Sequence, residues 1–219
     1  YGMSNSVVIP ENISGYPVVQ IAEGAFQDRA GLKAVTFPET LRVIGRRAFA
    51  QGGLEEIRIP DGVVRIGDDA FLNCPAKTVW IGSGLNTLGT DALIGSYRIN
   101  VHADNASFSS RDGVLFNKDQ TVLLFCPLGK TGFYPVPNGV LEIAPRAFFS
   151  QRSLTRINIP SSVVEIGPWA FGRCSALQKV VILNASTTLG EASFYECTSL
   201  EEITIPSEME EIPWYAFYN

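Results

Sequence analysis

The sequence predicts an α/β repeat solenoid, rich in β-strand and built from about eight coils of 22–23 residues. Two observations support this fold class. An Ala-Phe pair, or a close variant of it, recurs at steps of 22 or 23 residues, with a single step of 55. Ahead of each pair lies a short unit of two β-branched or aromatic residues separated by one residue and often followed by proline. Self-similarity at a fixed period of this length is the sequence signature of stacked repeats.

The first element of each coil is a short strand. Its alternating apolar residues should point to one buried face. The proline that often follows ends the strand, because proline has no N–H to donate to the ladder. These strands are expected at residues 7–9, 35–37, 57–59, 79–81, 134–136, 157–159, 180–182 and 203–205.

The rest of each coil is a second apolar segment followed by the Ala-Phe segment. The second segment, as in residues 63–66, turns at a pair such as Ile66-Gly67. The segment Ala-Phe-x-x-Cys that follows has helical spacing, with Phe71 and Cys74 on one side. One coil cannot bury these residues alone, so we expect a stack with a continuous core in which each Phe packs on the next.

The complete frame of one coil is L-x-x-I-x-I-P-x-x-V-x-x-I-G-x-x-A-F-x-x-C, which residues 54–74, 154–174 and 200–217 follow best. This frame resembles the BspA-like type of leucine-rich repeat, and the resemblance extends over essentially the whole chain. It implies a right-handed superhelix and a single leucine-rich-repeat domain over residues 1–219. Because the chain begins at Tyr1 and stops partway through a coil after Phe217, we expect it to be truncated at both ends.

The step of 55 residues contains an insertion at about residues 102–131. Within it, two extended runs at 114–116 and 122–125 surround a polar turn at 117–121, which predicts a β-hairpin. Two interpretations stay open, a binding finger and a decorated coil. The apolar residues Leu115, Leu123 and Phe125 favour the decorated coil, because they can form a small core.

The composition excludes several classes of function. The chain has a net charge of −5, which argues against a nucleic-acid binder, since such a protein needs a basic face. No apolar run approaches the roughly 20 residues that cross a bilayer, so we expect no membrane insertion. His102 is the only histidine, and no phosphate-binding glycine motif occurs. We therefore expect no enzyme, no cofactor and no metal site.

Three of the four cysteines occupy one position of the repeat. Cys74, Cys174 and Cys197 each stand three residues after the Phe of their coil, so they should point into the core as small hydrophobic residues. Cys174 and Cys197 lie on neighbouring coils, where disulfide geometry is tolerated. The resemblance implies a buried thiol at this position, and free thiols are the favoured interpretation.

The candidate binding surface is the outward face of the predicted strands, since residues that alternate with buried ones point to solvent. Arginine and aromatic residues are enriched at binding hot spots, and they gather in the middle of this face. The predicted partner-binding residues are Arg58, Trp80, Arg98, Asn100, Phe133, Arg156 and Asn158. The alternative interpretation is that Trp80 only pads the sheet.

A second aromatic group lies near the end of the sequence. A role in packing is the favoured interpretation, and a second partner-binding site is the alternative. Its members are Phe149, Trp169, Tyr195, Trp214, Tyr215 and Tyr218. Some of these rings are expected to contact a missing coil or cap.

These observations predict a non-enzymatic protein-recognition module. The resemblance implies an exported bacterial protein, displayed on the cell surface or secreted, that takes part in adhesion. A host extracellular or cell-surface protein is the expected partner. Two alternatives stay open: a carbohydrate-binding module that uses Trp80 as a stacking platform, and a structural spacer for another domain.

Overall fold

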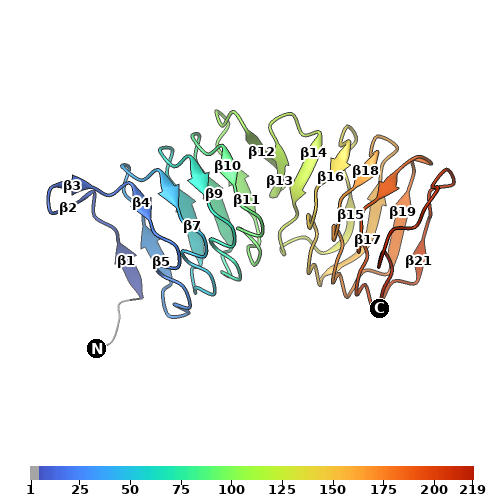
Figure 1. Cartoon of the computed structure of the whole chain (residues 1–219), viewed down its shortest axis with the longest axis horizontal. Coiled ribbons are helices and arrows are strands. Elements are labelled where there is room, and N and C mark those ends of the chain that lie inside the picture. The colour runs from blue at the N-terminus through green and yellow to red at the C-terminus, as the bar shows by residue number, and fades with distance from the viewer. Residues whose placement is uncertain (1–4) are drawn as a thin grey trace. The chain divides into compact units, whose positions relative to one another are not determined.

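The structure is a computed structural model that describes residues 5–219, and its packing divides the chain into two compact units. Unit 1 comprises residues 1–113 and unit 2 residues 114–219, and each is a stack of coils (Figure 1). The chain is a β-solenoid of about eight turns, which confirms the predicted repeat solenoid. The prediction of one domain over residues 1–219 stays a prediction.

Unit 1 contains three parallel sheets and one antiparallel hairpin. The first strands of its coils form two of these sheets: β1 (Ser6–Val8) with β5 (Ala34–Thr36), and β7 (Glu56–Ile59) with β9 (Thr78–Ile81) and β11 (Ile99–Val101). The second segments form the third sheet, in the order β4 (Gln20–Ile21), β6 (Val43–Ile44), β8 (Arg65–Ile66) and β10 (Thr87–Leu88). The hairpin joins β2 (Asn12–Ile13) to β3 (Tyr16–Pro17), and β12 (Phe108–Arg111) follows β11.

Unit 2 repeats this arrangement. Its first strands form a parallel sheet of β15 (Gly132–Pro135), β17 (Leu154–Ile159), β19 (Lys179–Ile182) and β21 (Glu202–Ile203). Its second segments pair in parallel in the order β14 (Val122–Phe125), β16 (Glu142–Ile143), β18 (Glu165–Ile166) and β20 (Thr188–Leu189). The strand β13 (Val114–Asn117) pairs antiparallel with β14.

The alternation predicted for the first strands is confirmed. Along β7 and β9 the β-branched residues Ile57, Ile59, Val79 and Ile81 are buried, whereas the residues between them are exposed or half-buried. Neighbouring strands pair in register, so equivalent residues of successive coils lie side by side in columns. Each exposed column is therefore a row of side chains about 4.8 Å apart.

The Ala-Phe segment of each coil is a run of turns, so the helical part of the predicted fold class is wrong; residues 5–219 contain no helix. In the second coil, the N–H groups of Phe49 and Gln51 donate to carbonyls of the next coil at 2.8 and 2.7 Å. The N–H of Ala50 donates within its own coil to Arg47 at 3.1 Å. Alternate amides thus bond two different coils, and no continuous helical ladder can form. Arg47 and Gln51 also have φ values of 52° and 58°, a conformation that a right-handed helix excludes.

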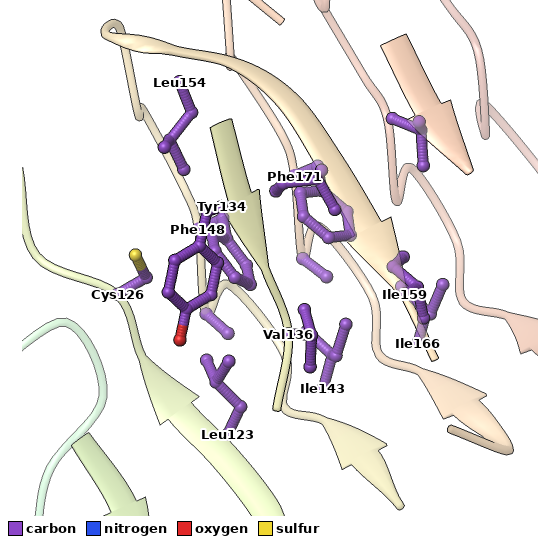
Figure 2. Close-up of a cluster of buried hydrophobic side chains, with 14 of the residues drawn as sticks. Leu123, Cys126, Tyr134, Val136, Ile143, Phe148, Leu154, Ile159, Ile166 and Phe171 are labelled. Carbon is purple, nitrogen blue, oxygen red and sulfur yellow. The ribbon is translucent and has the colours of Figure 1, made fainter. Parts of the chain in front are cut away.

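The phenylalanines stack as predicted within each unit. In unit 1 the ring centroid of Phe49 lies 5.0 Å from that of Phe26 and 5.3 Å from that of Phe71. In unit 2, Phe171 lies 4.7 Å from Phe148 and continues the stack on its other side. Figure 2 shows the side chains of both sheets of unit 2 pointing toward this stack. Because each ring packs on the next coil, the core is shared between neighbours rather than held in one coil.

The predicted hairpin of the insertion is confirmed, since β13 and β14 pair antiparallel. The strand β14 also pairs in parallel with β16, in the place that a second segment has in other coils. Leu115 and Leu123 are fully buried. The hairpin is therefore part of the stack, which supports the decorated coil over the binding finger.

In the part of the chain that the structure describes, no helix could span a membrane.

Candidate functional site

The predicted partner-binding residues lie on the outer faces of two sheets, one in each unit. In unit 1, Arg58 is on β7, Trp80 on β9, Asn100 on β11, and Arg98 directly precedes β11. We call these four residues the unit 1 patch. In unit 2, Phe133 is on β15, and Arg156 and Asn158 are on β17; these three are the unit 2 patch.

Trp80 stands at the centre of the unit 1 patch, in register with Arg58 on one side and Asn100 on the other. A carboxylate oxygen of Glu56 lies 2.5 Å from Nη2 of Arg58 and accepts the Nε1–H of Trp80 at 3.1 Å. The guanidinium carbon of Arg58 lies 5.3 Å from the centre of the indole ring, a cation–π contact. Glu56 therefore fixes both neighbours in one rigid group.

The indole ring of Trp80 stays accessible in this arrangement, with 43% of the residue surface exposed. Its N–H is already used, and one side of the ring is next to Arg58. Sequence reasoning did not include Glu56 among the site residues. The available signal was its position two residues before Arg58 on the same strand, which places both side chains on one face.

The unit 2 patch brings together only two of its three residues. The guanidinium carbon of Arg156 lies 5.6 Å from the ring centre of Phe133, which is 50% exposed. Next to Arg156 in the same column, Nζ of Lys179 forms an ion pair with Glu202 at 2.6 Å. Asn158 lies in the neighbouring column, in register with Pro135 on β15 and Val181 on β19.

The aromatic group near the end of the sequence packs against itself. Phe149, Trp169, Tyr195 and Tyr218 form a row with successive ring centroids 6.3, 4.7 and 5.3 Å apart. The residue beneath Trp169 is Gly172, whose missing side chain leaves space for the indole ring. Packing within unit 2 therefore accounts for these four rings. The ring of Tyr215 lies 5.6 Å from Tyr218 and 6.4 Å from Trp214, which is 74% exposed.

The described residues offer little material for covalent chemistry. All four cysteines are free and buried, and Cys74, Cys174 and Cys197 each donate to the carbonyl of a Phe in the preceding coil at 3.0 Å. Burial raises the pKa of the Cys74 thiol to about 11, which disfavours the reactive thiolate. His102 is half-exposed and accepts the Asp104 N–H. Among residues 5–219, no three acidic, histidine or cysteine side chains gather to hold a metal ion.

Comparison with known proteins gives one family and several similar folds. The family described as BspA type leucine rich repeat region matches residues 4–119 and 130–219, in six copies. A leucine-rich repeat protein from Eubacterium ventriosum is 24% identical, with a TM-score of 0.78; the match covers 96% of this chain and 62% of that one. The pneumococcal vaccine antigen PcpA is 22% identical, with a TM-score of 0.66, and the match covers 96% and 64%.

A leucine-rich repeat protein from Bacteroides ovatus is 19% identical, with a TM-score of 0.52; the match covers 97% of this chain and 76% of that one. At these identities the solved structures show a shared fold. This chain spans less than two thirds of the length of the first two. None of the curated proteins searched matches it.

Proposed function

This chain belongs to the BspA-type leucine-rich-repeat family, and from that premise we propose that it is a non-enzymatic recognition module of an exported bacterial surface protein. Its ligand is a protein, a host extracellular or cell-surface protein, and the role of the binding is adhesion. The binding surface is the outer face of the parallel sheets, led by the unit 1 patch.

The observation that carries this proposal is the group formed by Glu56, Arg58 and Trp80. An exposed tryptophan that is held by one hydrogen bond and flanked by an arginine has few conformations to lose when a ligand binds. Tryptophan and arginine are also the residues most enriched at binding hot spots. A rigid aromatic anchor on an open face supports recognition of a large partner.

The sheet beneath the patch adds to this rigidity. Trp80 lies on β9, which pairs with strands on both of its sides. The inward residues of the strand, Val79 and Ile81, are buried in the core. A side chain on such a strand is positioned more precisely than one on a loop, which favours a preformed binding surface.

A binding screen tests the proposal directly. The chain is offered to arrayed extracellular-matrix proteins and glycans, beside the double variant Arg58→Glu, Trp80→Ala. The matched control is Trp214→Ala, which removes an exposed indole from unit 2. Circular dichroism and melting temperatures establish that all three proteins are folded.

We expect the chain and the control to bind at least one protein of the array, and the double variant to lose that binding. Binding only to glycans would replace the proposal by a carbohydrate-binding module. A silent array would support a structural spacer.

A further inference from the structure

We propose that the unit 1 patch binds a carboxylate of the protein ligand, held by Arg98 and Asn100 beside the exposed ring of Trp80. This inference rests on the proposed function and adds the chemical class that the patch recognises. It follows from which polar side chains of the patch have a partner within the chain and which can still bind a ligand.

Two of the polar groups in the patch are satisfied within the chain. The charge of Arg58 is neutralised by Glu56, whose carboxylate lies 2.5 Å from the guanidinium. The same carboxylate accepts the N–H of Trp80. The group of three is therefore close to neutral, and it offers a ligand mainly the flat apolar surface of the indole ring.

Arg98 is the cation that remains. It is exposed, and among residues 5–219 it has no ion-pair partner. Its backbone carbonyl accepts the N–H of Val79 at 2.8 Å, which ties the base of its side chain to β9 next to Trp80. An arginine without a partner on a protein of net charge −5 is a favourable position for an anionic group.

Gly113 determines where the side chain of Arg98 lies. A Cβ on Gly113 would stand 2.8 Å from Cγ of Arg98 and 3.6 Å from both Cζ and Nη1. Only the absence of a side chain leaves this space, and the φ of 84° at Gly113 is itself unfavourable for other residues. The arginine stem thus rests on a glycine surface, so Gly113 is a positioning residue for the guanidinium.

Asn100 supplies a second donor on the same face. It stands two residues after Arg98, so both side chains leave the same side of the strand about 7 Å apart. It is in register with Trp80, is half-buried, and makes no side-chain hydrogen bond within the described chain. A guanidinium and an amide N–H₂ can both donate to one carboxylate, and charge-assisted bonds of this kind are the strong ones.

The ligand that fits these groups carries an aspartate or glutamate next to an apolar side chain. The carboxylate meets Arg98 and Asn100, and the apolar neighbour lies on the indole ring of Trp80. Because Glu56 holds the ring before binding and Gly113 leaves space for the arginine stem beside it, such a ligand meets a largely preformed surface.

A displayed library of random peptides tests the inference with a probe that needs no known ligand. Binders are selected on the whole chain, and one acidic binder is then compared with its Glu→Gln or Asp→Asn derivative on the chain and on the variant Arg98→Gln. Arg65→Gln is the matched control. Arg65 is exposed on β8, which lies in the sheet formed by the second segments of unit 1 and not in the sheet that carries the patch.

We expect the selected peptides to be enriched in an acidic residue beside an apolar one. Arg98→Gln should weaken the acidic peptide roughly tenfold or more, the range of a hydrogen bond to a charged group. It should leave the amide derivative nearly unchanged, and Gly113→Ala should weaken the acidic peptide in the same way. Arg65→Gln should bind like the unaltered chain.

Other results would overturn the inference. Peptides that need Trp80 but show no acidic preference, and that bind Arg98→Gln normally, would remove the carboxylate and leave the recognition function standing. Binding confined to acidic glycans of the array, lost in Arg98→Gln, would replace the protein carboxylate by a glycan one. The absence of any binder in both the library and the array would remove the proposed function together with the inference.

Discussion

At the scale of single residues, the side chain of Asn105 makes four hydrogen bonds to the backbone. Its side chain is fully buried, and its N–H₂ group donates to the carbonyls of Gly82 and Leu85 at 2.9 and 3.0 Å. Its carbonyl oxygen accepts the backbone N–H groups of Ser107 and Phe108 at 2.9 and 2.8 Å. One amide therefore satisfies four backbone groups where the insertion leaves the regular coil.

Replacing Asn105 by alanine should lower the free energy of unfolding by roughly 2–4 kcal/mol, because buried backbone groups lose their partners. Urea denaturation measures the change. Asn86→Ala is the control, since Asn86 is exposed, and it should cost less than about 0.5 kcal/mol. Equal stabilities of the two variants would show that the four hydrogen bonds do not hold this loop.

Glu142 shows a second effect at this scale. It pairs in register with Glu165 on the neighbouring strand. Partial burial, and then the charge of Glu165, raise the pKa of Glu142 above its usual value. The folded state therefore binds the Glu142 proton more tightly than the unfolded state does. The contribution of Glu142 to the free energy of unfolding is therefore complete at pH values below the pKa that Glu142 has in the unfolded chain. It is lost as the pH rises through the raised pKa that Glu142 has in the folded state.

Glu142→Gln should thus stabilise the protein at pH 7 and make little difference below about pH 4, where the wild-type carboxyl is protonated. Since the carboxyl group is only partly buried and solvent screens its charge, we expect a gain of only a few tenths of a kcal/mol. Melting temperatures at both pH values, compared with those of Glu55→Gln, measure it. A gain that persists at low pH would point to a cause other than charge.

At the scale of the coil, the glycine of the Ile-Gly pair is required by the close approach of neighbouring coils. A Cβ on Gly67 would stand 2.7 Å from the backbone nitrogen of Arg46. The equivalent glycines Gly45 and Gly167 would also meet the backbone of the preceding coil, at 2.8 and 2.6 Å. Backbone atoms cannot move aside as the end of a flexible side chain can.

Gly67→Ala should therefore destabilise the chain by about 1–3 kcal/mol, the usual range for overpacking. Gly31→Ala is the control, because a Cβ there would meet nothing within 4 Å. Thermal unfolding compares the two. A tolerated alanine at residue 67 would mean that the coils can separate without loss.

The stacked phenylalanines belong to the core, whereas Trp80 lies on the proposed binding face, so the two kinds of residue should differ in their effect on stability. Phe171 is fully buried between Phe148 and Phe194, so Phe171→Ala should cost roughly 3–5 kcal/mol. Trp80 is 43% exposed, and Trp80→Ala should cost less than about 1 kcal/mol. Chemical denaturation measures both. A loss at Trp80 as large as that at Phe171 would favour the padding interpretation.

The sequence predicts the first strands, the phenylalanine stack and the hairpin because each depends on a pattern within one coil. The helix predicted for the Ala-Phe segment fails for a reason that no single coil contains. Its alternate amides, such as those of Phe49 and Gln51, bond carbonyls of the next coil.

The same limit applies to the candidate site. Strand alternation predicts that Arg58 and Trp80 face outward. The same alternation places Glu56 on that face. It cannot predict the hydrogen bond from Trp80 to Glu56 or the space that Gly113 leaves for Arg98, because both depend on how neighbouring coils and turns meet.

At the scale of the whole molecule, charge is distributed unevenly. The chain carries a net charge of −5, yet the unit 1 patch contributes two arginines and no carboxylate of its own, with Glu56 offsetting one of them. A chain that is acidic overall therefore carries a locally cationic and aromatic surface, which under the proposed function faces the ligand. Under the proposed function, the repeat supplies the scaffold and the side chains of its outward columns supply the specificity.

The most direct test of this account is the affinity of one protein captured in the array, measured for Trp80→Ala and Trp214→Ala side by side. Both variants lose one exposed indole, but only the first lies in the unit 1 patch. We expect Trp80→Ala to weaken binding by roughly 30-fold or more, as for a hot spot, and Trp214→Ala to bind like the unaltered chain. Equal affinities of the two variants would contradict the assignment of the binding face to this sheet.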